Sequence, residues 1–170
     1  MPLSDLTLRD ADEADLPAIV AIYNATIPSR MVTADLEPVT VEARRPWLAA
    51  HQHPSRPIWV LCRSGGEVCA WLSFDTFYAR AAYDGTAMIA IYVAPSHRRQ
   101  GLGRHLLQLA IERSPRLGLH TLLGYIFGHN QPSLQLFERH GFARWGTFPH
   151  VAVLDGVERD LVIVGRRVAP

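Results

Sequence analysis

The stretch that decides the fold runs from Ile91 to Arg104 and reads Ile91-Tyr92-Val93-Ala94-Pro95-Ser96-His97-Arg98-Arg99-Gln100-Gly101-Leu102-Gly103-Arg104. It begins with residues typical of a strand, a proline ends that strand, and two glycines stand where a helix begins. The first turn of a helix exposes unpaired N–H groups and a partial positive charge, which suit a phosphate. The glycines let a bulky group approach the backbone, and three arginines add charged donors. The stretch therefore predicts a strand–loop–helix unit that can hold a phosphate-bearing ligand.

The two glycines do not complete either of the common nucleotide-binding fingerprints. Arg104 is followed by His105 and Leu106, so the pattern G-x-G-x-x-G is absent, and no Gly-Lys-Ser/Thr follows as in a Walker A loop. A Gly-x-Gly pair alone also fits a tight turn that lets a helix pack closely. The pair by itself leaves both interpretations open.

Strands and helices are expected to follow one another along the whole chain. Apolar periodicity, turn signals and helix-capping residues mark their limits. The expected strands cover residues 6–9, 58–63, 67–75, 86–94, 120–127, 142–154 and 157–168, and the expected helices cover 12–23, 40–51, 101–113 and 130–140. The order β-α-α-β-β-β-α-β-α-β-β predicts one α/β domain over residues 1–170, with a mixed sheet and parallel pairing in its second half. The strand at 86–94 is apolar enough to be buried on both faces.

Composition excludes several classes of protein. The chain has 17 basic and 16 acidic residues, a net charge of +1, which gives no basic excess for a nucleic-acid backbone. Every basic residue is an arginine, so a lysine Schiff base is excluded. No apolar run is long enough to span a membrane, and the start has no leader pattern. We expect neither a nucleic-acid nor a membrane partner.

The two cysteines, Cys62 and Cys69, have neither metal-site nor disulfide-framework spacing. A reducing cytoplasm is the expected location. A two-residue turn at Gly65-Gly66 would place the two cysteines opposite each other. Two buried thiols are favoured there over a cross-strand disulfide. The histidines, including His51-x-His53, show no ligand spacing, and no metal is expected.

Four blocks of sequence resemble one family. Arg98-x-x-Gly101-x-Gly103 after a strand resembles the acetyl-CoA loop of the GNAT N-acetyltransferases, whose pattern is Gln/Arg-x-x-Gly-x-Gly/Ala. Asn130-x-x-Ser133-(x)₃-Phe137-(x)₃-Gly141-Phe142 resembles the next block of that superfamily, and Arg9-(x)₅-Asp15-Leu16-(x)₂-Ile19 resembles its first strand and helix. Tyr83-Asp84-Gly85-Thr86-Ala87, followed by Ile91-Tyr92-Val93, is similar to the branch that includes phosphinothricin and methionine sulfoximine acetyltransferases.

The resemblance implies a GNAT-like fold with acetyl-CoA as co-substrate. In that family the strand at Ile91–Val93 carries a bulge, pairs its free backbone with the pantetheine arm and offers an N–H to the acyl oxyanion. The residues expected to bind acetyl-CoA are Ile91, Tyr92, Val93, Arg98, Arg99, Gln100, Gly101, Leu102, Gly103, Arg104, Asn130 and Ser133. Asn130 also fits a plain helix cap, and one residue can do both.

The sequence departs from this branch at both positions expected to transfer protons. The branch usually has a glutamate where this chain has Met88, and a thioether cannot accept a proton. Many members have a tyrosine, or this branch a histidine, where the chain has Phe137, which cannot protonate a leaving thiolate.

Three explanations of these departures stay open, and the catalytic residue is unknown at this stage. The amine can be neutral enough to attack with help from proximity and an oxyanion donor alone. Another residue can replace the missing base. Alternatively, the protein binds acyl-CoA without efficient turnover. The candidate replacements are Asp75, Asp84, Glu37, Tyr92, Tyr125 and His129.

An aromatic cluster with one arginine is the candidate substrate site. Its members are Phe77, Tyr78, Arg80 and Tyr83. Aromatic walls with a guanidinium suit a small amino acid, whose carboxylate the arginine would hold. A dimer contact explains the cluster equally well, because aromatic residues and arginine also favour interfaces.

The sequence therefore favours an N-acetyltransferase that moves an acetyl group from acetyl-CoA to the primary amine of a small molecule. An amino acid or an analogue such as phosphinothricin or methionine sulfoximine is the expected acceptor. The chemistry would be direct attack in a ternary complex, in a homodimer as in the branch. The alternatives are an acyl-CoA-binding protein that has lost catalysis and a protein N-terminal acetyltransferase.

Overall fold

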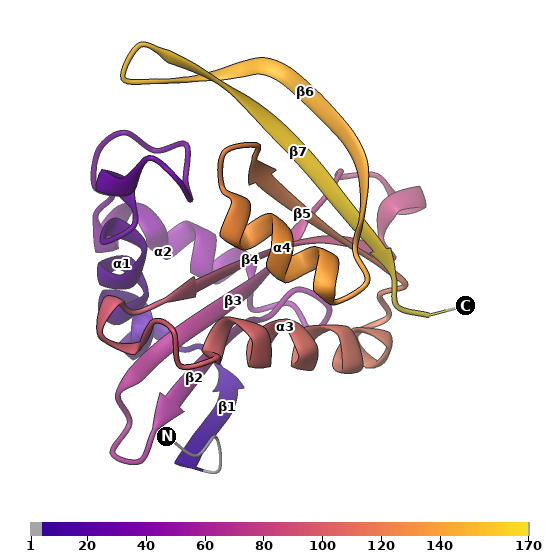
Figure 1. The fold of residues 1–170 in the computed structure, drawn as a ribbon. Helices are drawn as coiled ribbons and strands as arrows, with labels where there is room; N and C mark the ends of the chain where they lie inside the picture. Colours follow the sequence, from indigo (N-terminus) through magenta and orange to yellow (C-terminus); the bar gives the residue numbers. More distant parts are fainter. Residues whose placement is uncertain (1–4, 170) are drawn as a thin grey trace.

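The computed structural model describes residues 5–169, and within that range it has one seven-stranded sheet and four α-helices (Figure 1). The strands are β1 (Leu6–Asp10), β2 (Ile58–Arg63), β3 (Val68–Thr76), β4 (Thr86–Val93), β5 (Thr121–Phe127), β6 (Ala143–Leu154) and β7 (Val157–Arg167). The helices are α1 (Leu16–Asn24), α2 (Val41–Ala50), α3 (Leu102–Arg113) and α4 (Gln131–Arg139). The predicted fold class and the predicted order of elements are confirmed.

The sheet has the strand order β1-β2-β3-β4-β5-β7-β6. Only β4 and β5 run parallel, because the chain crosses from one to the other through α3. The prediction of parallel pairing in the second half is right for this pair and wrong for the rest. After the tight turn at Asp155-Gly156, β7 returns between β5 and β6 and pairs antiparallel with both.

The parallel pairing of β4 with β5 is short. It extends only from Thr86 opposite Thr121 to Met88 opposite Leu123. On its other side β4 stays paired with β3 as far as Val93, opposite Ala70. The backbone of β4 beyond Met88 therefore has no strand on the side that faces β5.

This divergence corrects two expectations about β4. The strand is not buried on both faces: Ala87 and Ile89 are buried, and its other residues are only partly covered. The expected bulge at Ile91–Val93 is absent, since the register with β3 is continuous. The free edge of β4 arises because β5 turns away, without an extra residue in β4.

Helices cover both faces of the sheet. The helices α1 and α2 pack on one face, where Tyr23 contacts Trp71 and Tyr92. On the other face α3 and α4 pack over Phe74 and Ile89 (Figure 1). Because side chains alternate along a strand, the odd-numbered residues of β4 face α3 and α4, and the even-numbered ones face α1 and α2.

The turn between β2 and β3 differs from the predicted two-residue turn. The N–H of Gly66 donates to the carbonyl of Arg63, and the register shifts so that Cys62 lies opposite Val68. Gly65 and Gly66 both have positive φ, 103° and 88°. The register shift between Leu61 and Cys62 is a β-bulge. Cys62 is therefore not opposite Cys69, and both thiols are free and buried as expected.

Gly124 of β5 sets how closely α4 approaches the sheet, and its substitution tests this packing. A Cβ at Gly124 would lie 2.8 Å from Cε1 of Phe137 and 3.0 Å from Cγ2 of Val164. We expect Gly124→Ala to lower the free energy of unfolding by about 1–3 kcal/mol, because the buried ring must move. Urea denaturation followed by circular dichroism measures the change.

Gly103→Ala is the matched control for this substitution. A Cβ at Gly103 would meet its nearest neighbours at 3.7 and 3.8 Å, which is ordinary contact. Since alanine also favours a helix, the variant should be as stable as the parent or up to about 1 kcal/mol more stable. Equal midpoints for the parent and Gly124→Ala would contradict the packing described here.

Candidate functional site

A cleft opens where β4 and β5 diverge. Its volume is about 210 Å³. We call it the β4–β5 cleft, and it is lined by Val32, Ile89, Ala90, Ile91, Tyr92, Val93, Gly103, Tyr125, Ile126, Asn130, Ser133, Leu136 and Phe137. The free backbone edge of β4 borders it, so an extended ligand can pair there as an added strand would.

A second space lies beyond the end of β4, where the loop enters α3. Its volume is about 690 Å³. We call it the arginine recess, and it is lined by Val93, His97, Arg98, Arg99, Gly101, Leu102, Gly103, Arg104, Pro132, Gln135, Leu136, Arg139 and His140. It shares Val93, Gly103 and Leu136 with the cleft, so the two spaces adjoin.

The start of α3 points at the arginine recess. Gly101 precedes the helix with φ of 83°, a left-handed conformation that glycine adopts without strain. No side chain caps the helix there, so its first N–H groups are available to a ligand. Arginines and a helix N-terminus together favour a phosphate group.

Of the residues predicted to bind acetyl-CoA, Gln100 lines neither space. Its amide donates to the carbonyl of Ser96 at 3.2 Å. Sequence reasoning missed Arg139, His140 and Leu136, which line the arginine recess from α4. Their helical spacing from Pro132 was the signal that could have found them.

Asn130 serves first as a structural residue. Its Oδ1 accepts from the N–H of Ser133 and caps α4, and its Nδ2 donates to the carbonyl of Met31 at 2.9 Å. The helix-cap interpretation is confirmed, and the side chain also lines the cleft. Asn130 thereby fixes the α1–α2 loop beside the mouth of the cleft.

The two departures from the expected acid and base lie beside the cleft. The Phe137 ring is buried, packs edge-on against Phe142 at 4.9 Å between centroids, and lines the cleft. Met88 is the last residue of β4 paired with β5, and it lies opposite Asp75 on β3. Neither Met88 nor Phe137 can exchange a proton.

The candidate bases occupy very different environments. Glu37 and Asp84 are exposed. Burial raises the pKa of the Tyr92 phenol, whose ring stacks on Trp71 at 4.3 Å, so Tyr92 stays protonated. Tyr125 lines the cleft and is 40% exposed. The Nε2–H of His129 donates to the carbonyl of Arg30 at 2.8 Å.

Among the candidate bases, Asp75 is a carboxylate held in place by several side-chain hydrogen bonds. It accepts hydrogen bonds from His51, Trp47 and Ser73. Burial tends to raise its pKa, but these donors more than offset that effect and hold the pKa below its usual value. Sequence reasoning considered His51 only as a metal ligand and missed this contact, because α2 and β3 are far apart in the chain.

The predicted substrate residues form one exposed group in the connection between β3 and β4. The rings of Phe77 and Tyr83 lie 5.5 Å apart, and the Arg80 guanidinium lies over the Tyr78 ring at 5.5 Å. Tyr78 and Tyr83 are exposed. None of the four lines the cleft or the arginine recess.

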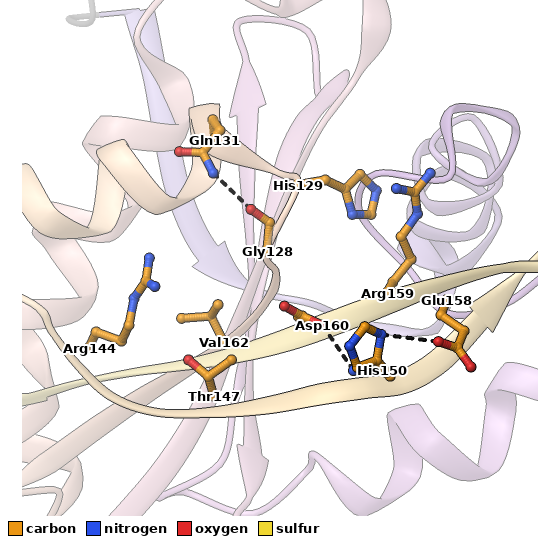
Figure 2. Close-up of a pocket in the computed structure, with 10 residues that line it drawn as sticks. All are labelled: Gly128, His129, Gln131, Arg144, Thr147, His150, Glu158, Arg159, Asp160 and Val162. Carbon is orange, nitrogen blue, oxygen red and sulfur yellow. Dashed lines mark hydrogen bonds and ion pairs between the residues drawn. The ribbon is translucent and has the colours of Figure 1, made fainter.

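A further polar recess of about 410 Å³ lies between the start of α4 and the β6–β7 hairpin (Figure 2). Its charges are balanced. His150 contacts Glu158 at 3.0 Å through Nδ1, and its backbone N–H donates to Asp160. Arg144 and Arg159 make no ion pair with the described residues. Because its charges are mixed, this recess fits a phosphate-bearing cofactor less well than the arginine recess does.

The cleft and the arginine recess together fit acetyl-CoA. The cleft is lined mostly by apolar side chains and offers a free strand edge for the pantetheine arm. The adjoining recess offers arginines and helix N–H groups for the diphosphate. No group of three or more residues that could hold a metal occurs in the part of the chain described, residues 5–169. No described helix is long and apolar enough to cross a membrane.

Comparisons with known proteins agree with this geometry. The model of the acetyltransferase (GNAT) family matches residues 19–142. YwnH of Bacillus subtilis is 53% identical over 96% of this chain and 100% of its own. The L-methionine sulfoximine/L-methionine sulfone acetyltransferase of Pseudomonas aeruginosa is 33% identical over 96% of this chain and 95% of its own.

A solved structure extends the likeness to the fold. The phosphinothricin acetyltransferase of Sinorhizobium meliloti, in complex with acetyl-CoA, is 26% identical and superposes with a TM-score of 0.88. The match covers 96% of this chain and 88% of that one. The family predicted from the sequence is thereby confirmed, and with it the fold, the enzyme class and acetyl-CoA as co-substrate. The chain belongs to the GNAT family of acetyltransferases.

Proposed function

We propose that this protein transfers the acetyl group of acetyl-CoA to the primary amine of a small amino acid or amino-acid analogue. Phosphinothricin and methionine sulfoximine are the model acceptors, since relatives of this chain are named for them. The single observation that carries the proposal is the β4–β5 cleft joined to the arginine recess. Such a space orients a thioester for attack by an amine in a ternary complex.

The residues proposed to bind acetyl-CoA form two groups, one for the pantetheine arm and one for the diphosphate. The free edge of β4 at Ile91–Val93 would pair with the pantetheine arm, and a backbone N–H there would stabilise the oxyanion. Arg98, Arg99 and Arg104, with the N–H groups after Gly101, would hold the diphosphate. Asn130 and Ser133 would contact the arm from the start of α4.

On the acceptor side, we retain Arg80 as the group that would hold the substrate carboxylate. The rings of Phe77, Tyr78 and Tyr83 would form an apolar wall beside it. These residues begin two positions after Asp75 and lead into β4. The placement supports an acceptor that approaches the cleft from the β3–β4 connection.

Release of free thiol from acetyl-CoA tests the reaction. We expect release that depends on an added amine, from a panel of phosphinothricin, methionine sulfoximine, ordinary amino acids and a short peptide. Mass spectrometry should find the acetylated amino acid. Acetylation of the peptide alone would instead favour a protein N-terminal acetyltransferase.

A second function is favoured by Met88 and Phe137. Since neither can exchange a proton, the protein could bind acyl-CoA and turn it over poorly. Calorimetric titration with CoA distinguishes the two functions. Binding of CoA without amine-dependent thiol release across the panel would support the binding module, and absence of CoA binding would contradict both functions.

Arg104 provides a direct test of the diphosphate site. We expect Arg104→Ala to weaken CoA binding about 5- to 20-fold by calorimetry, because it removes one or two charge-assisted hydrogen bonds. The loss should shrink at high salt, where the parent also binds more weakly. Arg116→Ala, an exposed arginine after α3, is the matched control and should bind CoA like the parent. Equal weakening in both variants would contradict a specific role for Arg104.

We also propose that the chain works as a homodimer in the cytoplasm. The β6–β7 hairpin exposes Trp145, Phe148, Val151, Val153 and Val157. Exposed apolar side chains gathered on one element favour association, and two free buried cysteines suit a reducing compartment. In Figure 1 the hairpin extends along one side of the molecule, where a second copy could cover it.

Light scattering after size-exclusion chromatography tests the dimer. We expect twice the mass of one chain for the parent and a single-chain mass for Val153→Glu, because a charge would be buried in the contact. Leu36→Glu, an exposed apolar residue outside the hairpin, is the control and should remain dimeric. A single-chain mass for the parent would contradict the proposal.

A further inference from the structure

Asp75 on β3 lies opposite Met88 on β4, the position where the branch that this sequence resembles usually has a glutamate. Strands β3 and β4 pair Asp75 with Met88 and Ser73 with Ala90. Directly opposed residues have Cβ atoms about 4.5–5.5 Å apart on the same face of an antiparallel pair. Ala90, on that face, also lines the β4–β5 cleft. A carboxylate at Asp75 therefore sits within about one residue of where a carboxylate at Met88 would sit.

The hydrogen bonds of His51 require a proton between His51 and Asp75. Nδ1 of His51 lies 2.8 Å from the carbonyl oxygen of Trp47, which can only accept, so Nδ1 carries a hydrogen. Nε2 of His51 lies 3.1 Å from Oδ1 of Asp75. In neutral His51 this would set a lone pair against a carboxylate. The pair is satisfied only when it holds a proton at that contact.

Asp75 is the more exposed member of the pair. Its side chain is 30% exposed, whereas that of His51 is 8% exposed. Oδ1 also accepts from Nε1 of Trp47 at 3.3 Å, and Oδ2 accepts from Oγ of Ser73 at 2.5 Å. These donors fix the carboxylate and leave one of its acceptor positions for an amine or a bridging water.

We propose that Asp75, backed by His51, accepts the proton of the attacking amine in place of the glutamate that Met88 replaces. This inference rests on the proposed acetyl transfer. Asp75 is the catalytic residue, since it would touch the amine or its water. His51 is a positioning residue that also stores the proton, and Trp47 and Ser73 hold the pair in place.

The proposed step moves one acetyl group from sulfur to nitrogen and one proton from the nitrogen to Asp75. The amine nitrogen forms a bond to the acetyl carbon, and the bond from that carbon to sulfur breaks with its electron pair on sulfur. The nitrogen loses one proton to Asp75, and the proton passes along the existing contact to Nε2 of His51. CoA leaves as the thiolate, and solvent removes the proton from His51 before the next turnover.

The charged neighbours set the pH at which the pair can act. Burial alone would lower the pKa of His51, but its hydrogen bonds to Asp75 and to the Trp47 carbonyl raise it above its usual value of 6.5, against a smaller opposing effect of Arg56. The other titratable groups packed on this face include Tyr23, Asp35, Arg44, Tyr92 and the buried thiol of Cys62. The pair accepts a proton only when His51 is neutral, so kcat should rise with pH through the raised pKa.

Kinetics of variants test the proposal with purified full-length protein, acetyl-CoA and the best amine of the panel. We expect Asp75→Asn to lower kcat by about 10²- to 10⁴-fold, the usual worth of a general base, while CoA affinity stays within threefold of the parent. His51→Gln should abolish the rise of kcat with pH near neutrality. Asp75→Asn combined with Met88→Glu should recover much of the lost kcat, because the carboxylate returns one strand away.

Asp10→Asn is the matched control, an exposed carboxylate on β1, and should leave kcat unchanged. Titration of the His51 ring by NMR gives a readout that does not depend on turnover: its pKa should fall in Asp75→Asn. An active parent with an unchanged kcat and pH profile in Asp75→Asn would overturn the role of Asp75 alone. A parent without amine-dependent thiol release would overturn the proposed function, and with it this role.

Discussion

The separation of β4 from β5 after three residue pairs is the constraint on which the rest of the site depends. A fully paired sheet would use every N–H and C=O of β4 internally. Because β5 stays with β7 as far as Phe127, its divergence leaves one edge of β4 free. The same divergence opens the space that Tyr125, Leu136 and Phe137 line. A strand edge and a narrow cleft thus arise from one feature of the topology.

Met88 stands where the branch usually has an acidic residue, and the neighbouring strand β3 carries a carboxylate, Asp75, on the same face of the sheet. In the proposed mechanism a carboxylate is needed on that face of the sheet, and Asp75 on β3 supplies it opposite Met88. Asp75 has His51 behind it, so the pair can hold a proton near neutral pH, which a lone carboxylate does poorly. Phe137 cannot protonate the leaving thiolate, whereas the phenols of Tyr92 and Tyr125 also line the cleft.

Much of this site could be predicted from the sequence, because local chemistry decides it. Gly101 and the arginines beside it predict a helix start suited to phosphate, and Thr40 and Asn130 cap α2 and α4 as predicted. Asp12 caps the 3-10 turn Glu13–Asp15 that leads into α1. Features that depend on long-range packing were not visible. The contact of His51 with Asp75 joins residues 24 positions apart, the divergence of β5 from β4 has no motif, and Arg139 faces the recess only because α4 docks beside α3.

Hydrogen–deuterium exchange with and without CoA tests the central claim most directly, because it reads the free edge of β4 itself. If the free edge of β4 binds the pantetheine arm, CoA slows exchange at the amides of residues 89–93 and of the first turn of α3. The amides of the residues that line the recess between α4 and the β6–β7 hairpin should exchange at the same rate with and without CoA (Figure 2). Unchanged exchange along β4 at saturating CoA, or protection confined to that other recess, would contradict it.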